Sequence, residues 1–169
     1  DKLLGGPQAG VILGRGDLVA ACSAHPLARA VRADKVTLAA LQHVALAYLS
    51  GDAGSLPLWR MAATSVDELR SRAHLVVERL TGSSASASAL GSASVVETEA
   101  VAGGGSLPGL TIPSVGVAVR VERPDVVLGG LRDHDVVARI ERDAVVCDLR
   151  TVDPVDDGRL ADALIAVCG

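Results

Sequence analysis

Lysine is rare in this chain, so each lysine is a candidate for chemistry that arginine cannot perform. The sequence has fourteen arginines but only two lysines, Lys2 and Lys35. A primary amine can lose its proton and form a Schiff base, whereas a guanidinium cannot. Lys2 stands just before the Gly5-Gly6-Pro7 turn, where glycines allow a close approach of the backbone to a phosphate. Lys2 is therefore a candidate cofactor ligand, although a surface lysine at a frayed terminus is the simpler interpretation.

Two arginines form a second candidate site. Arg29 and Arg32 are three residues apart and follow the helix-breaking pair His25-Pro26. Two guanidinium groups so close in the sequence can bind an oxyanion such as phosphate with paired hydrogen bonds. The alternative is a solvated charged face paired with Asp34, and the spacing alone does not separate these interpretations.

Several common site patterns are absent from the sequence. Gly14-Arg15-Gly16 lacks the third glycine of a dinucleotide-binding fingerprint, and the glycine loop 103–109 has Pro108 where that motif needs glycine. There is no G-x-S-x-G motif, and the four histidines show no metal-ligand spacing with one another or with cysteine. We therefore expect no bound metal.

Composition excludes further classes of function. The net charge of −4 argues against a basic nucleic-acid-binding surface over the whole chain. One Trp, one Tyr and no Phe exclude base-stacking platforms and predict a core of Ala, Val and Leu. Three widely spaced cysteines favour reduced thiols, and no leader or apolar run of membrane-spanning length occurs. We expect a cytoplasmic protein without membrane contact and, since the first residue is not Met, a C-terminal piece of a longer one.

The first part of the chain is expected to be largely helical. Residues 11–13 predict a short buried strand, and 17–22 a short helix. From Asp34, a plausible N-cap, a helix is expected to reach residue 49. Its apolar face is predicted to comprise Leu38, Leu41, Ala45 and Leu49. Residues 50–55 are expected to form a linker.

The second part alternates helices with Val-rich strands. Ser65 and Glu68 form a capping box before a helix whose apolar face is Val66, Leu69, Ala73, Val76, Val77 and Leu80. Residues 82–91 are a Ser/Ala-rich loop. Strands are expected at 94–101, 115–121, 136–140 and 144–149, and helices at 124–133 and 156–167. This order predicts a small α+β layer packed on one sheet face.

Four segments carry a family resemblance. The first two are residues 1–10, DKLLGGPQAG, and residues 25–38, HPLARAVRADKVTL. The glycine loop 103–109 and residues 148–152, DLRTV, follow. Together, over nearly the whole chain, they resemble the bacterial selenocysteine synthase family, the L-seryl-tRNA(Sec) selenium transferases.

The resemblance implies an α/β protein of the fold-type-I architecture of pyridoxal-phosphate enzymes. Residues 1–55 would form the C-terminal end of the large, cofactor-binding domain. Residues 60–169 would form the small α+β C-terminal domain.

The resemblance also assigns roles to site residues. The lysine of the first block binds pyridoxal 5'-phosphate covalently in that family, which implies a catalytic and cofactor-binding role for Lys2. Asp1 resembles the acidic neighbour expected to assist proton transfers. The arginines of the second block are expected to hold selenophosphate, a role that falls on Arg29 and Arg32. Lys35 is expected to be structural or a secondary anion contact.

The implied reaction converts seryl-tRNA(Sec) to selenocysteyl-tRNA(Sec). The seryl hydroxyl is eliminated, and selenium from selenophosphate is added at the same carbon. The tRNA contacts are expected mainly in an N-terminal part that this chain lacks, and family members assemble as rings of dimers. The chain alone is expected to be inactive.

Two other interpretations remain open. One is a related fold-type-I lyase acting on a small amino acid or an amino sugar phosphate. The other is a non-catalytic, truncated module that serves only subunit association.

Overall fold

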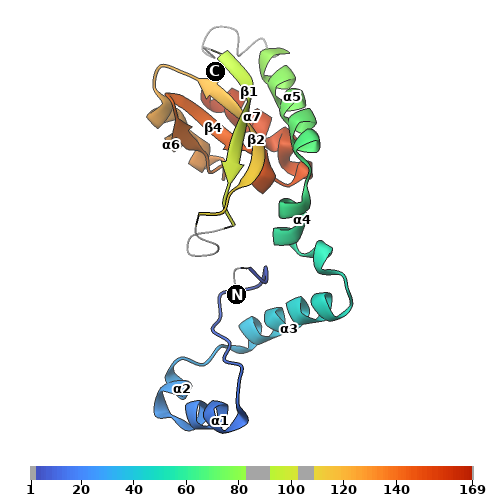
Figure 1. Ribbon diagram of the computed structural model, residues 1–169. Helices are drawn as coiled ribbons and strands as arrows, with labels where there is room; N and C mark the ends of the chain where they lie inside the picture. The colour runs from blue at the N-terminus through green and yellow to red at the C-terminus, as the bar shows by residue number, and fades with distance from the viewer. Residues whose placement is uncertain (1–2, 83–91, 103–108, 169) are drawn as a thin grey trace. The chain divides into compact units, whose positions relative to one another are not determined.

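The chain folds as a mixed α/β protein with a small antiparallel sheet (Figure 1). The computed structural model describes residues 3–82, 92–102 and 109–168. These residues divide into two compact units, one drawn mainly from the chain up to Arg60 and the other from Met61–Val101 and the chain from Gly109 onward. The Ser/Ala-rich loop and the glycine loop fall almost entirely outside the described residues.

The first unit is helical. Its elements are α1 (Gly16–Ala24), α2 (Pro26–Ala30), α3 (Lys35–Leu49), the short 3-10 turn η1 (Ala53–Ser55) and the start of α4 (Pro57–Ala63). Asp34 caps α3 as expected, because its Oδ1 accepts a hydrogen bond of 2.8 Å from the backbone N–H of Thr37. The helices predicted at 17–22 and 34–49 are confirmed.

The predicted buried strand at residues 11–13 is wrong. Val11, Ile12 and Leu13 have no regular structure, and their exposed fractions are 60%, 66% and 88%. A strand needs a neighbouring strand for its backbone hydrogen bonds, and every described strand belongs to the second unit. The apolar run therefore has no regular structure and stays exposed.

The predicted apolar face of α3 is also largely wrong. The buried side chains are Val44 and Ala47, which pack with Leu56, whereas Leu38 and Leu49 are exposed. Because α3 is apolar on more than one side, its sequence periodicity does not single out the packed face.

The second unit is a four-stranded antiparallel sheet with three helices. The strands lie in the order β1-β2-β4-β3. They are β1 (Ser92–Ala100), β2 (Ile112–Arg120), β3 (Arg139–Glu141) and β4 (Ala144–Asp148). The helices are α5 (Val66–Gly82), α6 (Pro124–Asp133) and α7 (Asp157–Cys168), with 3-10 turns η2 (Leu149–Thr151) and η3 (Pro154–Asp156). All four predicted strands and the predicted helices are confirmed, with ends that differ by a few residues.

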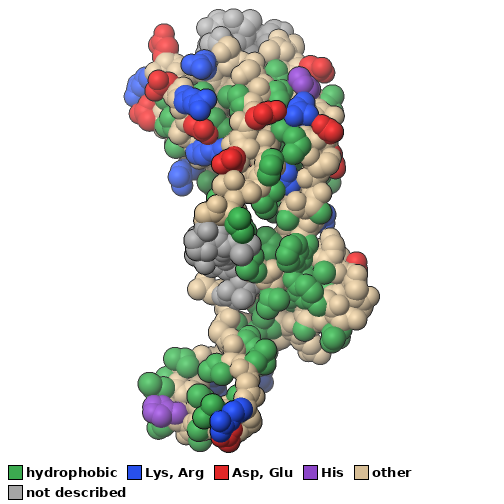
Figure 2. Space-filling view, viewed as in Figure 1, with side chains coloured by type: hydrophobic (Ala, Val, Ile, Leu, Met, Phe, Trp, Pro, Cys, Tyr) green, Lys and Arg blue, Asp and Glu red, His purple; other side chains and the backbone are tan. Residues whose placement is uncertain are grey.

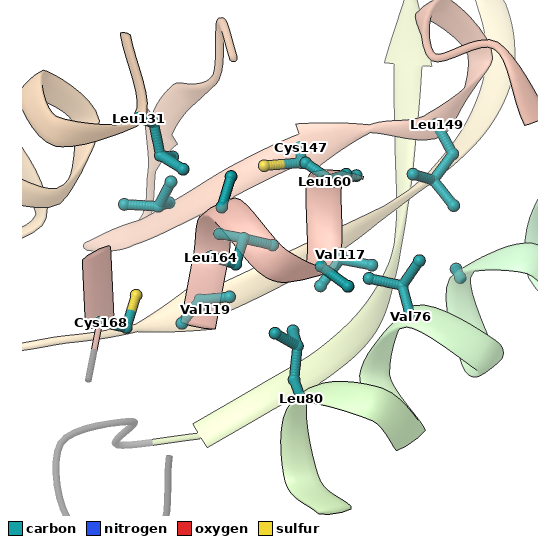
Figure 3. Close-up of a cluster of buried hydrophobic side chains, with 14 of the residues drawn as sticks. Val76, Leu80, Val117, Val119, Leu131, Cys147, Leu149, Leu160, Leu164 and Cys168 are labelled. Carbon is teal, nitrogen blue, oxygen red and sulfur yellow. The ribbon is translucent and has the colours of Figure 1, made fainter. Parts of the chain in front are cut away.

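The core of this unit lies between the helices and one face of the sheet (Figure 3). Val115, Val117 and Val119 of β2 all belong to it, because alternate residues of a strand face the same side. The helices contribute mostly leucine, alanine and valine, such as Leu80 and Leu164. Apart from Cys147 and Cys168, the core consists mainly of Ala, Val and Leu, as predicted from a sequence without Phe.

Two polar contacts fix α5. At its start, Ser65 Oγ accepts a hydrogen bond of 3.1 Å from the backbone N–H of Glu68, the capping contact that the sequence predicts. Deeper in the helix, the buried Arg72 pairs with both carboxylate oxygens of Asp157 on α7, at 2.8 and 2.7 Å. It also donates to the Val152 carbonyl at 2.8 Å. These contacts fix the start of α5 and hold the helix against α7.

The core position of two thiols predicts selective labelling. Burial raises the pKa of Cys147 to about 12, and burial also raises the pKa of Cys168. Thiolates are the reactive species, so both should resist maleimide at about pH 8 while the exposed Cys22 reacts. Mass spectrometry of labelled peptides checks this, with urea-unfolded chain as the control in which all three react. Rapid labelling of Cys147 in the folded protein would contradict the core packing.

Candidate functional site

The turn that follows Lys2 is held by residues from two distant parts of the sequence. Asp1 and Lys2 themselves lie outside the described residues. Gly5 has a φ of +76°, a conformation that favours glycine. A Cβ at Gly5 would lie 3.2 Å from Leu58 Cβ, and one at Gly6 would lie 3.1 Å from Val44 Cγ2. The two glycines of the DKLLGGP segment are therefore needed for conformation and for close packing.

A side-chain hydroxyl holds the same turn. Tyr48 Oη, on α3, donates a hydrogen bond of 3.1 Å to the carbonyl of Leu4. The indole Nε1–H of Trp59 in turn donates to Tyr48 Oη. The backbone two residues after Lys2 is thus attached to α3 by a hydrogen bond that spans 44 residues of sequence.

Arg29 and Arg32 are exposed and unengaged within the described chain. Arg29 lies in the last turn of α2, and Arg32 lies in the connection to α3. Neither makes a hydrogen bond or ion pair with another described residue. Asp34, the partner that a solvated charged face would supply, instead accepts from the N–H and the hydroxyl of Thr37. No described residue therefore occupies the donors of these two guanidinium groups.

Side-chain caps frame the segment that carries these arginines. His25 Nδ1 accepts a hydrogen bond of 3.2 Å from the backbone N–H of Leu27 at the start of α2. Asp34 caps α3 at the other end of the segment. Lys35 begins α3 and is exposed. Caps at both ends restrict the backbone on which Arg29 and Arg32 stand.

The cap at Asp34 predicts a pH dependence. Hydrogen bonding from the Thr37 backbone lowers the pKa of Asp34. A depressed carboxyl pKa adds stability above the ordinary value of about 4, and this stability is lost as the pH falls through the folded-state pKa. Protection of the Thr37 amide from hydrogen exchange, corrected for the chemical rate, should therefore drop on acidification. Asp34→Asn keeps an acceptor without the charge, and its protection should change little. Equal acid sensitivity in both proteins would contradict the cap.

The DLRTV segment has a structural role. The guanidinium of Arg150 is buried and donates only to backbone carbonyls. Nη1 donates to the carbonyls of Met61, Ala62 and Thr64 at 2.7, 3.1 and 2.9 Å, and Nη2 donates to Pro113 at 2.6 Å. Its Nε has no hydrogen-bond partner within the part of the chain that the structure describes. Arg150 therefore fastens the chain before α5 to the start of β2.

The sheet face opposite the helices carries a polar network. Asp148 Oδ1 accepts from Ser114 Oγ at 2.6 Å and from the Arg150 N–H at 3.0 Å. Arg139, on the edge strand β3, lies 3.7 Å from Asp148 Oδ2 and donates to Thr98 Oγ1 on β1. Hydrogen bonds and an ion pair between these side chains thus link all four strands.

Sequence reasoning missed the anchoring residues of both units. Tyr48 and Trp59 are the one Tyr and the one Trp of the chain. Their rarity could have marked them as residues with a specific role. Arg150 was noted only as part of a family segment.

Within residues 3–82, 92–102 and 109–168, no three His, Cys, Asp or Glu side chains gather as metal ligands. No helix in these ranges is both long and apolar enough to cross a membrane.

The sequence of this chain is similar to those of one family of known proteins. The family model for L-seryl-tRNA selenium transferase (SelA) matches residues 1–153. A curated relative of that name from Moorella thermoacetica is 41% identical over 98% of this chain and 36% of its own length. Relatives of the same name from Geotalea daltonii and Wolinella succinogenes are 38% and 36% identical, over 97% and 90% of this chain. The chain spans about a third of the length of the curated relatives it matches. Because the family model covers nine-tenths of its residues, the chain belongs to the L-seryl-tRNA selenium transferase family.

Proposed function

We propose that this chain is the C-terminal part of an enzyme that converts seryl-tRNA(Sec) to selenocysteyl-tRNA(Sec) with selenium from selenophosphate. The observation that carries the proposal is the family match over residues 1–153, which includes Lys2, Arg29 and Arg32. The curated relatives bear the name of this activity. An enzyme of the family's length that contains this chain is called the complete enzyme below.

The surface of the first unit supports a larger assembly. Only three of its described side chains, Val44, Ala47 and Leu56, form a buried cluster. Large apolar side chains are exposed along its whole length, and Figure 2 shows them grouped on this unit. They include Ile12, Leu13, Leu18, Leu27, Val31, Val36, Leu46 and Leu49. So much exposed apolar surface on so small a core is typical of a face that other protein covers.

We propose that residues 1–55 complete a large cofactor domain of fold type I and that residues 60–169 form the small domain. The two compact units support this division, since the first comprises the chain up to Arg60 with a short segment from residue 102, and the second begins at Met61. Further copies in a ring of dimers would cover more of the apolar surface. Three free cysteines are compatible with a reducing cytoplasm.

The cofactor of this proposal is pyridoxal 5'-phosphate. An aldehyde cofactor needs a primary amine, and its attachment is favoured when the backbone that carries the amine is preorganised. The segment after Lys2 is held through Leu4, Gly5 and Gly6. The residues present therefore fit the group. When bound, pyridoxal phosphate withdraws electrons from the carbon next to the amine of an amino-acid substrate.

Each candidate residue has a task in this scheme. Lys2 holds the cofactor and, once released, removes the α-proton of the seryl group, with Asp1 assisting the proton transfer. Arg29 and Arg32 bind the oxyanion of selenophosphate and neutralise its charge while selenium is transferred. Lys35 is structural or a secondary anion contact.

The charge of the second unit supports a tRNA site elsewhere in the complete enzyme. Met61–Val101 and Gly109–Gly169 contain ten arginines, no lysine and sixteen carboxylates. A polyanion is repelled by such a surface, since affinity for nucleic acid depends mainly on contacts between cations and phosphates. The contacts to seryl-tRNA(Sec) are therefore proposed in the part of the complete enzyme outside this chain.

The direct experiment is conversion of radiolabelled seryl-tRNA(Sec) by the complete enzyme with pyridoxal phosphate and selenophosphate. Formation of selenocysteyl-tRNA(Sec) is expected. Turnover of a small amino acid or amino sugar phosphate instead would favour a related lyase. No turnover with either class, together with no covalent cofactor, would favour an association module.

A further inference from the structure

We propose that Tyr48 is a positioning residue that, with Trp59, holds the lysine-bearing turn in place for cofactor attachment. This inference rests on the proposed function, because it assigns Lys2 to the cofactor. Its structural basis is the convergence of α3 and the Leu56–Trp59 segment on the backbone that follows Lys2.

The hydroxyl of Tyr48 uses both of its hydrogen-bonding capacities. It donates to the Leu4 carbonyl at 3.1 Å and accepts the indole N–H of Trp59. A tyrosine hydroxyl is one donor and an acceptor, so the Trp59 contact leaves its proton directed to Leu4. The ring is half-buried and packs against the cluster of Val44, Ala47 and Leu56, which fixes where the hydroxyl lies.

The turn has little freedom to move relative to this pair. Gly5 is in the left-handed region and packs against Leu58, and Gly6 packs against Val44. The Leu4 carbonyl, Gly5 and Gly6 are therefore each held, by residues that lie about forty to fifty positions away in the sequence. The phenol is the one side chain in the described chain that is hydrogen-bonded to this turn.

The consequence concerns Lys2, two residues before Leu4. An amine reacts with an aldehyde efficiently when the backbone that carries it is preorganised, because fewer orientations must be lost on reaction. Without the Tyr48 hydroxyl, the Leu4 carbonyl loses its donor and the Trp59 N–H loses its acceptor. The packing of Gly5 against Leu58 and of Gly6 against Val44 then remains.

The test compares Tyr48→Phe with the wild type in the complete enzyme, starting from cofactor-free protein. The first readout is hydrogen exchange of the peptide that covers residues 3–9, which needs no cofactor. The second is the initial rate at which pyridoxal phosphate and cyanoborohydride label Lys2, measured by peptide mapping and normalised to labelling of the exposed Lys35. Ser71→Ala is the matched control, because it also removes a hydroxyl-to-carbonyl hydrogen bond, from Ser71 to Asp67 in α5.

Tyr48→Phe is expected to exchange faster over residues 3–9 and to label Lys2 about five- to tenfold more slowly, the size expected for one or two lost hydrogen bonds. Trp59→Phe, which leaves the bond to Leu4 in place, should give a smaller loss of the same kind. Ser71→Ala should match the wild type. Labelling of Lys2 at the wild-type rate in Tyr48→Phe would overturn the inference. If wild-type Lys2 takes no label at all, it is the proposed function that fails.

Discussion

Replacing Arg32 by lysine in the complete enzyme should leave elimination of the seryl hydroxyl intact and abolish most of the selenium transfer. Lysine keeps the positive charge but lacks the planar fork that binds an oxyanion through two parallel hydrogen bonds. Loss of one preorganised donor costs about 2–4 kcal/mol of transition-state stabilisation, a fall in rate of about 30- to 1000-fold. A split assay measures it, with loss of water from seryl-tRNA(Sec) followed separately from incorporation of radioactive selenium.

The structure supplies a matched control for this experiment. Arg15 is an exposed arginine of the same unit, but it pairs with Asp17 at 2.6 Å, whereas Arg29 and Arg32 have no described partner. Arg15→Lys should therefore support both half-reactions at the wild-type rate. If Arg32→Lys slows elimination and selenium transfer equally, the arginine serves the cofactor or the seryl substrate, and its role toward selenophosphate is wrong.

The second large effect concerns stability and falls on Arg150. Arg150→Met should lower the free energy of unfolding by about 3 kcal/mol, because four backbone carbonyls lose a charged donor within a buried site. Urea unfolding of the chain, followed by circular dichroism, measures the change. Arg159→Met is the control, since the partner of Arg159 among the described residues is Asp156, in an exposed pair at 3.2 Å. This substitution should change stability by less than about 0.5 kcal/mol. Equal effects of the two substitutions would show that the carbonyl contacts of Arg150 add little.

The secondary structure of the second unit could be predicted because its helices and strands bury a common core within the chain. The apolar positions of α5 repeat with helical spacing and are buried against one sheet face, and Pro124 and Asp133 bound α6 where expected. In such a unit the sequence pattern and the burial pattern agree. The tie between Arg150 and the carbonyls before α5 could not be predicted, because it joins residues almost ninety positions apart.

The first unit was harder to predict for the opposite reason. Its apolar residues lie on several sides, and most of them are exposed in this chain, so the periodicity of α3 and the run at residues 11–13 gave wrong burial. The candidate residues Lys2, Arg29 and Arg32 came from residue type and family resemblance, which do not depend on packing. The Tyr48–Trp59 pair depends on packing and emerged only from the structure.

The proposed attachment of the cofactor to Lys2 can be tested by locating the covalent bond. The complete enzyme, loaded with pyridoxal phosphate, is reduced with borohydride, digested and mapped by mass spectrometry. We expect the phosphopyridoxyl group on the peptide that contains Lys2, and its loss in Lys2→Arg. The chain has one other lysine, Lys35. Cofactor fixed on Lys35, or on a lysine outside this chain, would contradict the assignment of Lys2.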